Sequence, residues 1–197
     1  MSGDSAEATI QRVLHALESA GVPYMLTGSF ASAFHGSPRT TQDVDVVIAP
    51  TLGSLNALLR QFPHEKYYVS REAALQAYGS ESLFNVIDMD SGWKIDFIIR
   101  KSRPFSTEEF SRRKQADLLG TTLFVASAED VILSKLEWAK LSESERQLND
   151  VAGIVRTQGD GLDFNYVKRW VAALSLESQW QSAQAKAGIT HALSPTR

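Results

Sequence analysis

The chain has 197 residues, of which 43% are hydrophobic and 22% charged, and its formal net charge is −3. This length and apolar content predict one globular domain, or one domain with a small helical appendage. The slightly acidic balance excludes a global basic field that would recruit nucleic acid, and the absence of cysteine excludes disulfides, thiolate metal sites and cysteine nucleophiles.

The N-terminal stretch has a helical pattern. Apolar residues recur at helical spacing between Ala6 and Ala20, and Gly21 is a natural helix stop. The stretch carries acids early and has no continuous apolar run, which predicts neither a signal peptide nor a membrane span. We therefore expect a cytoplasmic protein with no membrane partner.

Short strands and helices alternate from there to residue 99. The sequence predicts strands at Tyr24–Leu26 and Asp43–Ile48, and helices at Phe30–Phe34, Leu52–Phe62 and Arg71–Tyr78. Two further strand-like runs, Leu83–Met89 and Trp93–Ile99, flank the turn sequence Asp90-Ser91-Gly92. This arrangement predicts an antiparallel hairpin.

The remaining sequence changes from strand to helix. Gln115–Leu119 and Thr121–Val125, on either side of Gly120, predict a second hairpin, and Ser127 is typical of a helix N-cap. Helical spacing then continues, including Arg146–Val155 and Asn165–Leu174. The element order predicts an α/β or, more closely, α+β fold: a mixed β-sheet core with flanking helices (1–126), a C-terminal helical region (127–187) and a frayed tail (188–197).

Two acids stand side by side in the second predicted strand. Residues two apart in a strand point to the same face, so the Asp43 and Asp45 carboxylates would repel each other. A divalent cation between them would relieve the repulsion, and Mg²⁺ commonly takes one or two carboxylates together with phosphate oxygens and water. The alternative is a solvated strand end with two acids that bind nothing.

Two other positions support the metal interpretation. Gly28 and Ser29 stand where a strand runs into a helix, and free N–H groups at a helix start suit phosphate, although Ser29 could equally be an ordinary N-cap. Asp96 lies inside an apolar strand, where an acid is costly unless it has a partner. If that strand neighbours the Asp43–Asp45 strand, three carboxylates converge; otherwise Asp96 lies on a wet face with Lys94 beside it.

Residues 28–48 carry Gly-Ser at a helix start, then Thr-x-Asp-x-Asp and an apolar strand. This pattern resembles the polymerase-β-like nucleotidyltransferase superfamily. The resemblance implies a nucleotidyltransferase core in which Asp43, Asp45 and Asp96 are catalytic and hold the metal.

The C-terminal half resembles one branch of that superfamily. Residues 127–136 are similar to a helix of the AbiEii-type toxin branch and its uncharacterised relatives, in which a lysine, here Lys135, reaches the nucleotide phosphates. Residues 146–151 resemble a helix motif whose acid, here Asp150, faces the active site. Lys135 and Asp150 would then line the same cleft as the three carboxylates, with Gly28 and Ser29 also gripping the nucleotide.

The implied activity is transfer of a nucleoside monophosphate from a nucleoside triphosphate to a hydroxyl, with Mg²⁺ or Mn²⁺ as cofactor. The implied partners are the triphosphate, a tRNA, protein or small-molecule acceptor, and an antitoxin. One alternative is a non-catalytic nucleotide- or partner-binding protein that retains the fold. A haloacid-dehalogenase-type phosphatase is disfavoured, because there the acids follow the apolar strand, whereas here they precede it.

Overall fold

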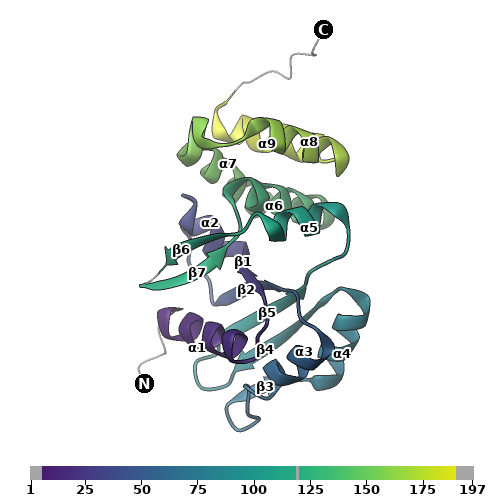
Figure 1. Ribbon diagram of the computed structural model, residues 1–197. Helices are drawn as coiled ribbons and strands as arrows, with labels where there is room; N and C mark the ends of the chain where they lie inside the picture. Colours follow the sequence, from purple (N-terminus) through teal and green to yellow (C-terminus); the bar gives the residue numbers. More distant parts are fainter. Residues whose placement is uncertain (1–5, 119, 190–197) are drawn as a thin grey trace. The chain divides into compact units, whose positions relative to one another are not determined.

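A computed structural model describes residues 6–118 and 120–189 of the chain (Figure 1). Its strands are β1 (Tyr24–Leu26), β2 (Asp43–Ile48), β3 (Tyr67–Val69), β4 (Leu83–Asp88), β5 (Lys94–Ile99), β6 (Lys114–Leu118) and β7 (Thr121–Val125). Its helices are α1 (Ala6–Ser19), α2 (Gly28–Phe34), α3 (Leu52–Leu59), α4 (Arg71–Ser80), α5 (Pro104–Ser111), α6 (Ala128–Ser142), α7 (Glu145–Gln158), α8 (Phe164–Ala173) and α9 (Glu177–Ala187), with a 3₁₀ turn at Gly159–Gly161. Most of the predicted frayed tail, from residue 190 on, lies outside the described residues, as does Leu119 at the end of a predicted strand.

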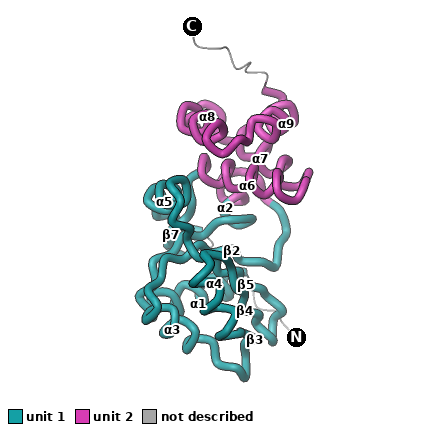
Figure 2. Tube along the Cα trace, turned by 90° about the vertical axis from the view of Figure 1, so that its right-hand side faces the viewer, with its two compact units in different colours: residues 1–31, 39–127 teal, residues 32–38, 128–197 magenta. Residues whose placement is uncertain are grey.

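The chain forms two compact units (Figure 2). Unit 1 comprises Met1–Ala31 and Arg39–Ser127, and unit 2 comprises Ser32–Pro38 and Ala128–Arg197. Unit 2 therefore includes a short segment from the N-terminal half of the chain. Within the described residues, no helix has the length and hydrophobicity needed to cross a membrane.

Unit 1 is built on a mixed seven-stranded sheet with the order β3-β4-β5-β2-β1-β7-β6. The pairs β2–β5 and β1–β7 are parallel, and the other neighbours are antiparallel. Both predicted hairpins are present, as β4–β5 and β6–β7. The α+β fold class and the mixed sheet are thus confirmed.

The two faces of the sheet differ because side chains alternate along each strand. On one face β2 and β5 present only apolar side chains, all nearly inaccessible: Val44, Val46, Ile48, Ile95, Phe97 and Ile99. Asp88 of β4 lies on this face too, and Arg12 of α1 reaches it at 2.8 Å, so α1 covers this side. The other face carries the acids of β2 and β5.

Unit 2 packs its helices closely around glycines. A Cβ atom at Gly36 would lie 2.3 Å from the Thr157 side chain, and one at Gly153 would lie 2.7 Å from Ser37 Oγ. The hydroxyl of Thr157 also donates to the Gly36 carbonyl oxygen at 3.1 Å. The segment Ser32–Pro38 is therefore held against α7 by contacts that a larger residue at either glycine would prevent.

Candidate functional site

The three predicted carboxylates share one face of neighbouring strands. In the parallel β2–β5 pair, Asp45 lies opposite Asp96, and Asp43 lies opposite Lys94. Register partners, and residues two apart on one strand, point to the same side of a sheet. All four side chains therefore lie on the face opposite the apolar core of β2 and β5.

Lys94 supplies the positive charge among these acids. Its Nζ atom lies 2.9 Å from Asp96 Oδ2 and 3.5 Å from Asp43 Oδ1. The hydrogen bond to Asp96, followed by the charges of Asp96 and Asp43, raises the pKa of Lys94 against the opposing effect of partial burial. An ammonium group thus lies between two of the three carboxylates that the sequence predicts to share a cation.

Asp96 nevertheless has capacity for another ligand. The side chain of Asp96 is 15% exposed, and its Oδ1 atom is buried with no hydrogen-bond partner. As the side chains stand, no three histidine or acidic residues within 6–118 and 120–189 are grouped closely enough to hold a metal ion. A cation shared by Asp43, Asp45 and Asp96 would require Lys94 to move aside, and their metal-binding role stays a prediction.

The backbone at the start of α2 lies directly against Asp45. Gly28 has φ +63°, and a Cβ atom there would lie 2.0 Å from Asp45 Oδ2. The amide of Thr27 donates to the Asp45 carbonyl oxygen at 2.9 Å. Only glycine combines this positive φ with so close an approach, so the helix start and the second acid of the pair are held side by side.

Ser29 is buried, and its hydroxyl has a defined partner. The guanidinium of Arg39 donates a hydrogen bond to Ser29 Oγ. Sequence patterns gave Arg39 no role of its own, because nothing local shows that the loop before β2 returns to α2. This hydrogen bond places the positive charge of Arg39 next to Ser29, the residue that follows Gly28.

Lys135 and Asp150 form a buried ion pair in unit 2. Lys135 Nζ lies 2.7 Å from Asp150 Oδ2, with side chains 5% and 7% exposed, and donates to Gln147 Oε1 at 3.0 Å. Burial excludes a solvated surface lysine and a surface acid at these positions. Gln147 was not singled out from the sequence. That the pair lines one cleft with the carboxylates of unit 1 stays a prediction.

No protein-family model matches the chain, and no curated protein matches it. Several solved structures do match the chain. An antigenic nucleotidyltransferase-like protein from Paracoccidioides brasiliensis has a TM-score of 0.57 at 18% identity, covering 93% of this chain and 92% of that one. ANT(2")-Ia in complex with adenylyl-2"-tobramycin has 0.56 at 15%, covering 88% and 98%. The lincosamide antibiotic adenylyltransferase LnuA, lincomycin-bound, has 0.53 at 11%, covering 77% and 96%. The chain thus has the fold of nucleotidyltransferases.

Proposed function

We propose that this chain is a metal-dependent nucleotidyltransferase that moves a nucleoside monophosphate from a nucleoside triphosphate to a hydroxyl group. The observation that carries the proposal is the register of β2 and β5, which puts Asp43, Asp45 and Asp96 on one sheet face, with Gly28 against Asp45. Because Gly28 has no side chain, the backbone at the start of α2 can approach the Asp45 carboxylate closely.

In the proposed reaction the acceptor oxygen forms a bond to the α-phosphorus of the triphosphate. The bond from that phosphorus to the bridging oxygen breaks, and pyrophosphate leaves with the bonding electrons. The hydroxyl proton passes to Asp96, whose buried Oδ1 has no other partner. Proton transfer by a positioned carboxylate is an ordinary mode of acid–base catalysis.

Asp43, Asp45 and Asp96 are the side chains that would hold Mg²⁺ or Mn²⁺, since hard divalent ions prefer carboxylate oxygens. When bound, such an ion neutralises triphosphate charge and stabilises the leaving pyrophosphate. Until then, the ammonium group of Lys94 offsets the negative charges of Asp96 and Asp43 through its contacts with both side chains. The ammonium must leave this position for the acids to turn toward a cation.

In unit 1, Gly28 and Ser29 would contact the nucleotide phosphates, and nucleotide-binding roles are also proposed for Lys135 and Asp150. The last two roles rest on the resemblance to the AbiEii-type branch, as does an antitoxin partner. Among acceptors, a small hydroxyl compound has support from two of the similar structures, one holding adenylyl-2"-tobramycin and one lincomycin. RNA, including tRNA, and protein hydroxyls are the other candidates.

One observation favours a second candidate function. With Lys94 in contact with two of the three acids, the cluster is partly neutralised without any metal. A protein that keeps the fold and binds a nucleotide or a partner without catalysis would have this arrangement as its permanent state. The two candidates differ in whether pyrophosphate is released.

The test supplies each α-³²P-labelled nucleoside triphosphate with Mg²⁺ or Mn²⁺ to the whole protein. Acceptors are offered as separate pools of total RNA, protein and small metabolites, and label transfer and pyrophosphate are measured. We expect metal-dependent transfer into one pool, lost in Asp45→Asn and kept in Asp160→Asn, an exposed acid of unit 2. Nucleotide binding without transfer or pyrophosphate release in every pool would establish the non-catalytic alternative.

A further inference from the structure

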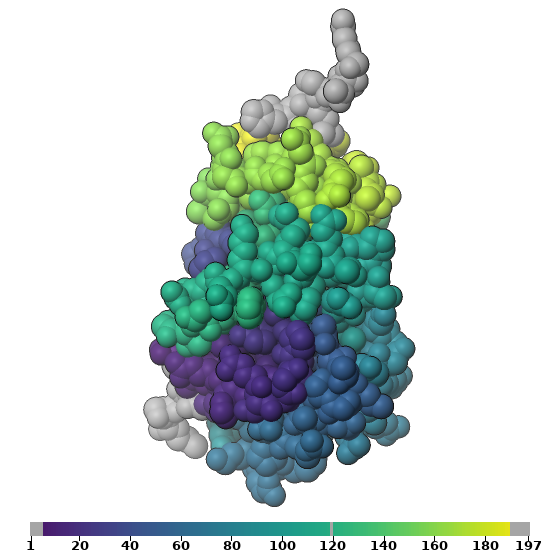
Figure 3. Space-filling view, in the orientation of Figure 1, coloured from purple at the N-terminus to yellow at the C-terminus, as the bar shows by residue number. Residues whose placement is uncertain are grey.

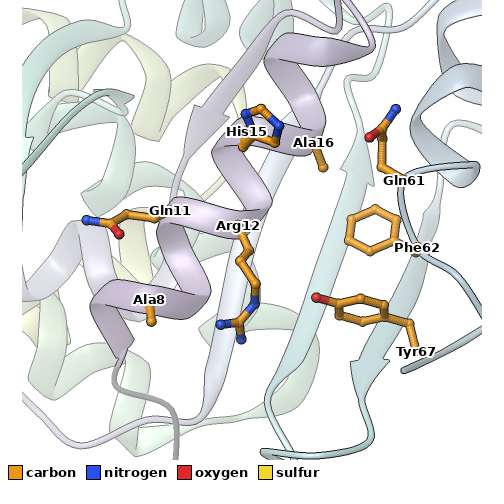
Figure 4. A pocket seen from close by; sticks show the side chains of 8 residues that line it. All are labelled: Ala8, Gln11, Arg12, His15, Ala16, Gln61, Phe62 and Tyr67. Carbon is orange, nitrogen blue, oxygen red and sulfur yellow. The ribbon is translucent and has the colours of Figure 1, made fainter. Parts of the chain in front are cut away.

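Unit 1 contains a cavity that the acidic cluster does not use. It has a volume of about 470 Å³ and is lined by side chains from α1, from the segment after α3 and from Tyr67 of β3 (Figure 4). This volume falls within the range of about 300–1,000 Å³ that is usual for small-molecule sites. Helix α1, at the purple end of the colour range, is visible on the surface in Figure 3.

The cavity lies on the other side of the sheet from the carboxylates. Arg12, one of its lining residues, bonds to Asp88 of β4. Asn85 is the register partner of Asp96 and shares its face, and Asp88 is an odd number of positions further along β4. Because side chains alternate, Asp88 and the cavity belong to the face opposite Asp96.

The polar lining suits an anion. Arg12 and His15 are the basic lining residues and Gln61 adds an amide, whereas Gln11 donates its amide to Glu7 and Thr121. None of the eight described lining residues carries a carboxylate. The guanidinium of Arg12 is positioned by Asp88 Oδ2 at 2.8 Å, and the two side chains are 36% and 6% exposed. Arg12 Nη2 also donates to Thr9 Oγ1 at 3.3 Å, and the planar guanidinium fork of this lining residue is suited to oxyanions.

The apolar lining suits a flat ring. Phe62 and Tyr67 meet edge to face with ring centroids 5.2 Å apart, and Phe62 also packs against the fully buried Phe97. These contacts fix the aromatic wall before any ligand arrives. Tyr67 directs its hydroxyl oxygen toward the α1 side of the cavity, where Arg12 lies (Figure 4).

We propose that this cavity binds a small organic oxyanion carrying a flat ring, with the oxyanion at Arg12 and the ring against Tyr67. We propose further that the turn between β4 and β5 responds to its occupancy. Asp88 holds Arg12 through Oδ2, while its Oδ1 accepts the amides of Asp90 at 3.0 Å and Ser91 at 3.2 Å. A ligand that attracts the Arg12 guanidinium weakens its contact with the Asp88 carboxylate. Because the same carboxylate accepts the hydrogen bonds of this turn, the conformation of the turn changes.

The turn leads directly into Lys94, the residue that lies between the acids on the other face. Trp93 immediately precedes Lys94, is nearly buried, and packs 6.0 Å from the ring of Phe30. Its indole is therefore a reporter between the cavity and the acidic cluster. Ligand binding should shift the Trp93 indole N–H resonance, which a Trp93→Phe variant assigns.

The binding test uses the whole protein without nucleotide or metal, so its outcome is independent of the proposed transferase activity. Phenyl phosphate and benzoate are titrated by calorimetry and ¹⁵N NMR beside inorganic phosphate, which lacks the ring, and benzyl alcohol, which lacks the charge. We expect at least one of the two ring-bearing anions to bind about tenfold or more tightly than either control compound, and to shift the Trp93 resonance.

Variants locate the site. Ala8→Phe fills the cavity without removing a polar group and should abolish binding, whereas Ala73→Phe, which adds the same ring at an exposed position of α4, should not. Arg12→Lys keeps a cation for Asp88 but loses the fork and should weaken binding about tenfold. Unchanged binding in Ala8→Phe, or no binding of either ring-bearing anion at about 10 mM, overturns the site. Binding that leaves Trp93 unshifted overturns its link to the turn.

Discussion

At the scale of single residues, the candidate site contains carboxylates that repel one another and neighbouring groups that offset this repulsion. Alternation along β2 is sufficient to predict that Asp43 and Asp45 share a face. The contacts of Lys94 are beyond sequence reasoning, because they depend on the register between β2 and β5, strands that residues 49–93 separate in the sequence. The same holds for Arg39 and Ser29, which meet only after the loop before β2 has folded back.

Replacing Asp45 by Asn removes one negative charge and keeps the shape of the side chain. Without metal, the variant should be at least as stable as the parent, since a repulsion between neighbouring acids is lost. Mg²⁺-dependent triphosphate binding should weaken sharply and transfer should fall further, because the cation loses a charged ligand. Thermal unfolding without metal, followed by binding and turnover with Mg²⁺, measures both. A strongly destabilised variant would instead make Asp45 a structural residue.

Replacing Gly28 by Ala should destabilise unit 1 by about 2 kcal/mol or more, because the new Cβ meets the Asp45 carboxylate and the residue needs a positive φ. Gly53→Ala is the matched control, since Gly53 lies in α3 with its nearest neighbour 3.8 Å from an added Cβ. Urea denaturation of both variants gives the comparison. Equal stability of the two would mean that Asp45 moves away from α2 at no cost.

Replacing Lys94 by Met removes the ammonium from between the acids. Mg²⁺ binding without nucleotide should tighten by about tenfold, because the resident positive charge no longer competes. Lys101→Met, at an exposed position after β5, should leave Mg²⁺ affinity unchanged. Calorimetric titration of the three proteins measures this, and weaker Mg²⁺ binding in Lys94→Met would mean that Lys94 supports the metal site.

The raised pKa of Lys94 sets the pH range in which its contacts stabilise the fold. Because the folded pKa exceeds the unfolded value of about 10.4, the contribution is complete at lower pH and disappears as pH rises through the folded pKa. The stability difference between the parent and Lys94→Met should therefore be constant across the neutral and mildly alkaline range. A difference that changes near neutral pH would show that another group titrates with Lys94.

At the scale of elements, strong sequence patterns predicted the structure and weak ones did not. Two elements, β3 and α5, had no counterpart among the predictions, and α9 was covered only by the predicted helical region 127–187. Strand β3 is only three residues long and lies at the sheet edge. Helix α5 buries Phe105 and Phe110, which are five positions apart and do not mark a helical face. Helix α9 has correctly spaced buried residues, but most of them are small or polar, so the apolar pattern is faint.

The junction of α6 and α7 yields a prediction about Lys135 and Asp150. Lys135→Met leaves the Asp150 carboxylate buried without its ion partner and should cost about 3–5 kcal/mol of unfolding free energy. The double variant Lys135→Met/Asp150→Leu removes both charges and should recover much of that loss. Urea denaturation measures the cycle. Full stability of the single variant would contradict the buried pair.

The same double variant separates structure from nucleotide binding. If Lys135 grips phosphate, the folded double variant binds triphosphate more weakly than the parent. If the ion pair serves only to join α6 and α7, triphosphate affinity is unchanged while the fold persists. Circular dichroism confirms that the variant is folded before nucleotide is titrated.

At the scale of the whole molecule, the sequence predicted a sheet-containing part followed by a helical part, and the structure has both. It could not predict that residues 32–38 belong to unit 2, because local patterns carry no information about which distant segments meet. Nor could it give the strand order, in which the parallel pairs join segments far apart in the chain.

Replacing Gly36 by Ala tests the attachment of that segment. The added Cβ would meet the Thr157 side chain, and the φ of +110° disfavours alanine, so unit 2 should lose about 2 kcal/mol or more. Gly79→Ala, with no neighbour within 4 Å of an added Cβ, is the control. Hydrogen exchange of α7 amides reports the loss locally. Unchanged protection of α7 would mean that the segment contributes nothing to its stability.

The position of residues 32–38 in unit 2 also has a consequence for biosynthesis. Gly36 accepts a hydrogen bond from Thr157, which follows it by 121 positions. At bacterial or eukaryotic translation rates of about 5–20 residues per second, the ribosome reaches that residue only after on the order of ten seconds. During this interval the nascent chain can complete the sheet of unit 1 but not the packing of the segment that interrupts it. Residues 32–38 therefore emerge from the ribosome before the part of unit 2 against which they pack. We expect chaperones to engage the chain during this interval.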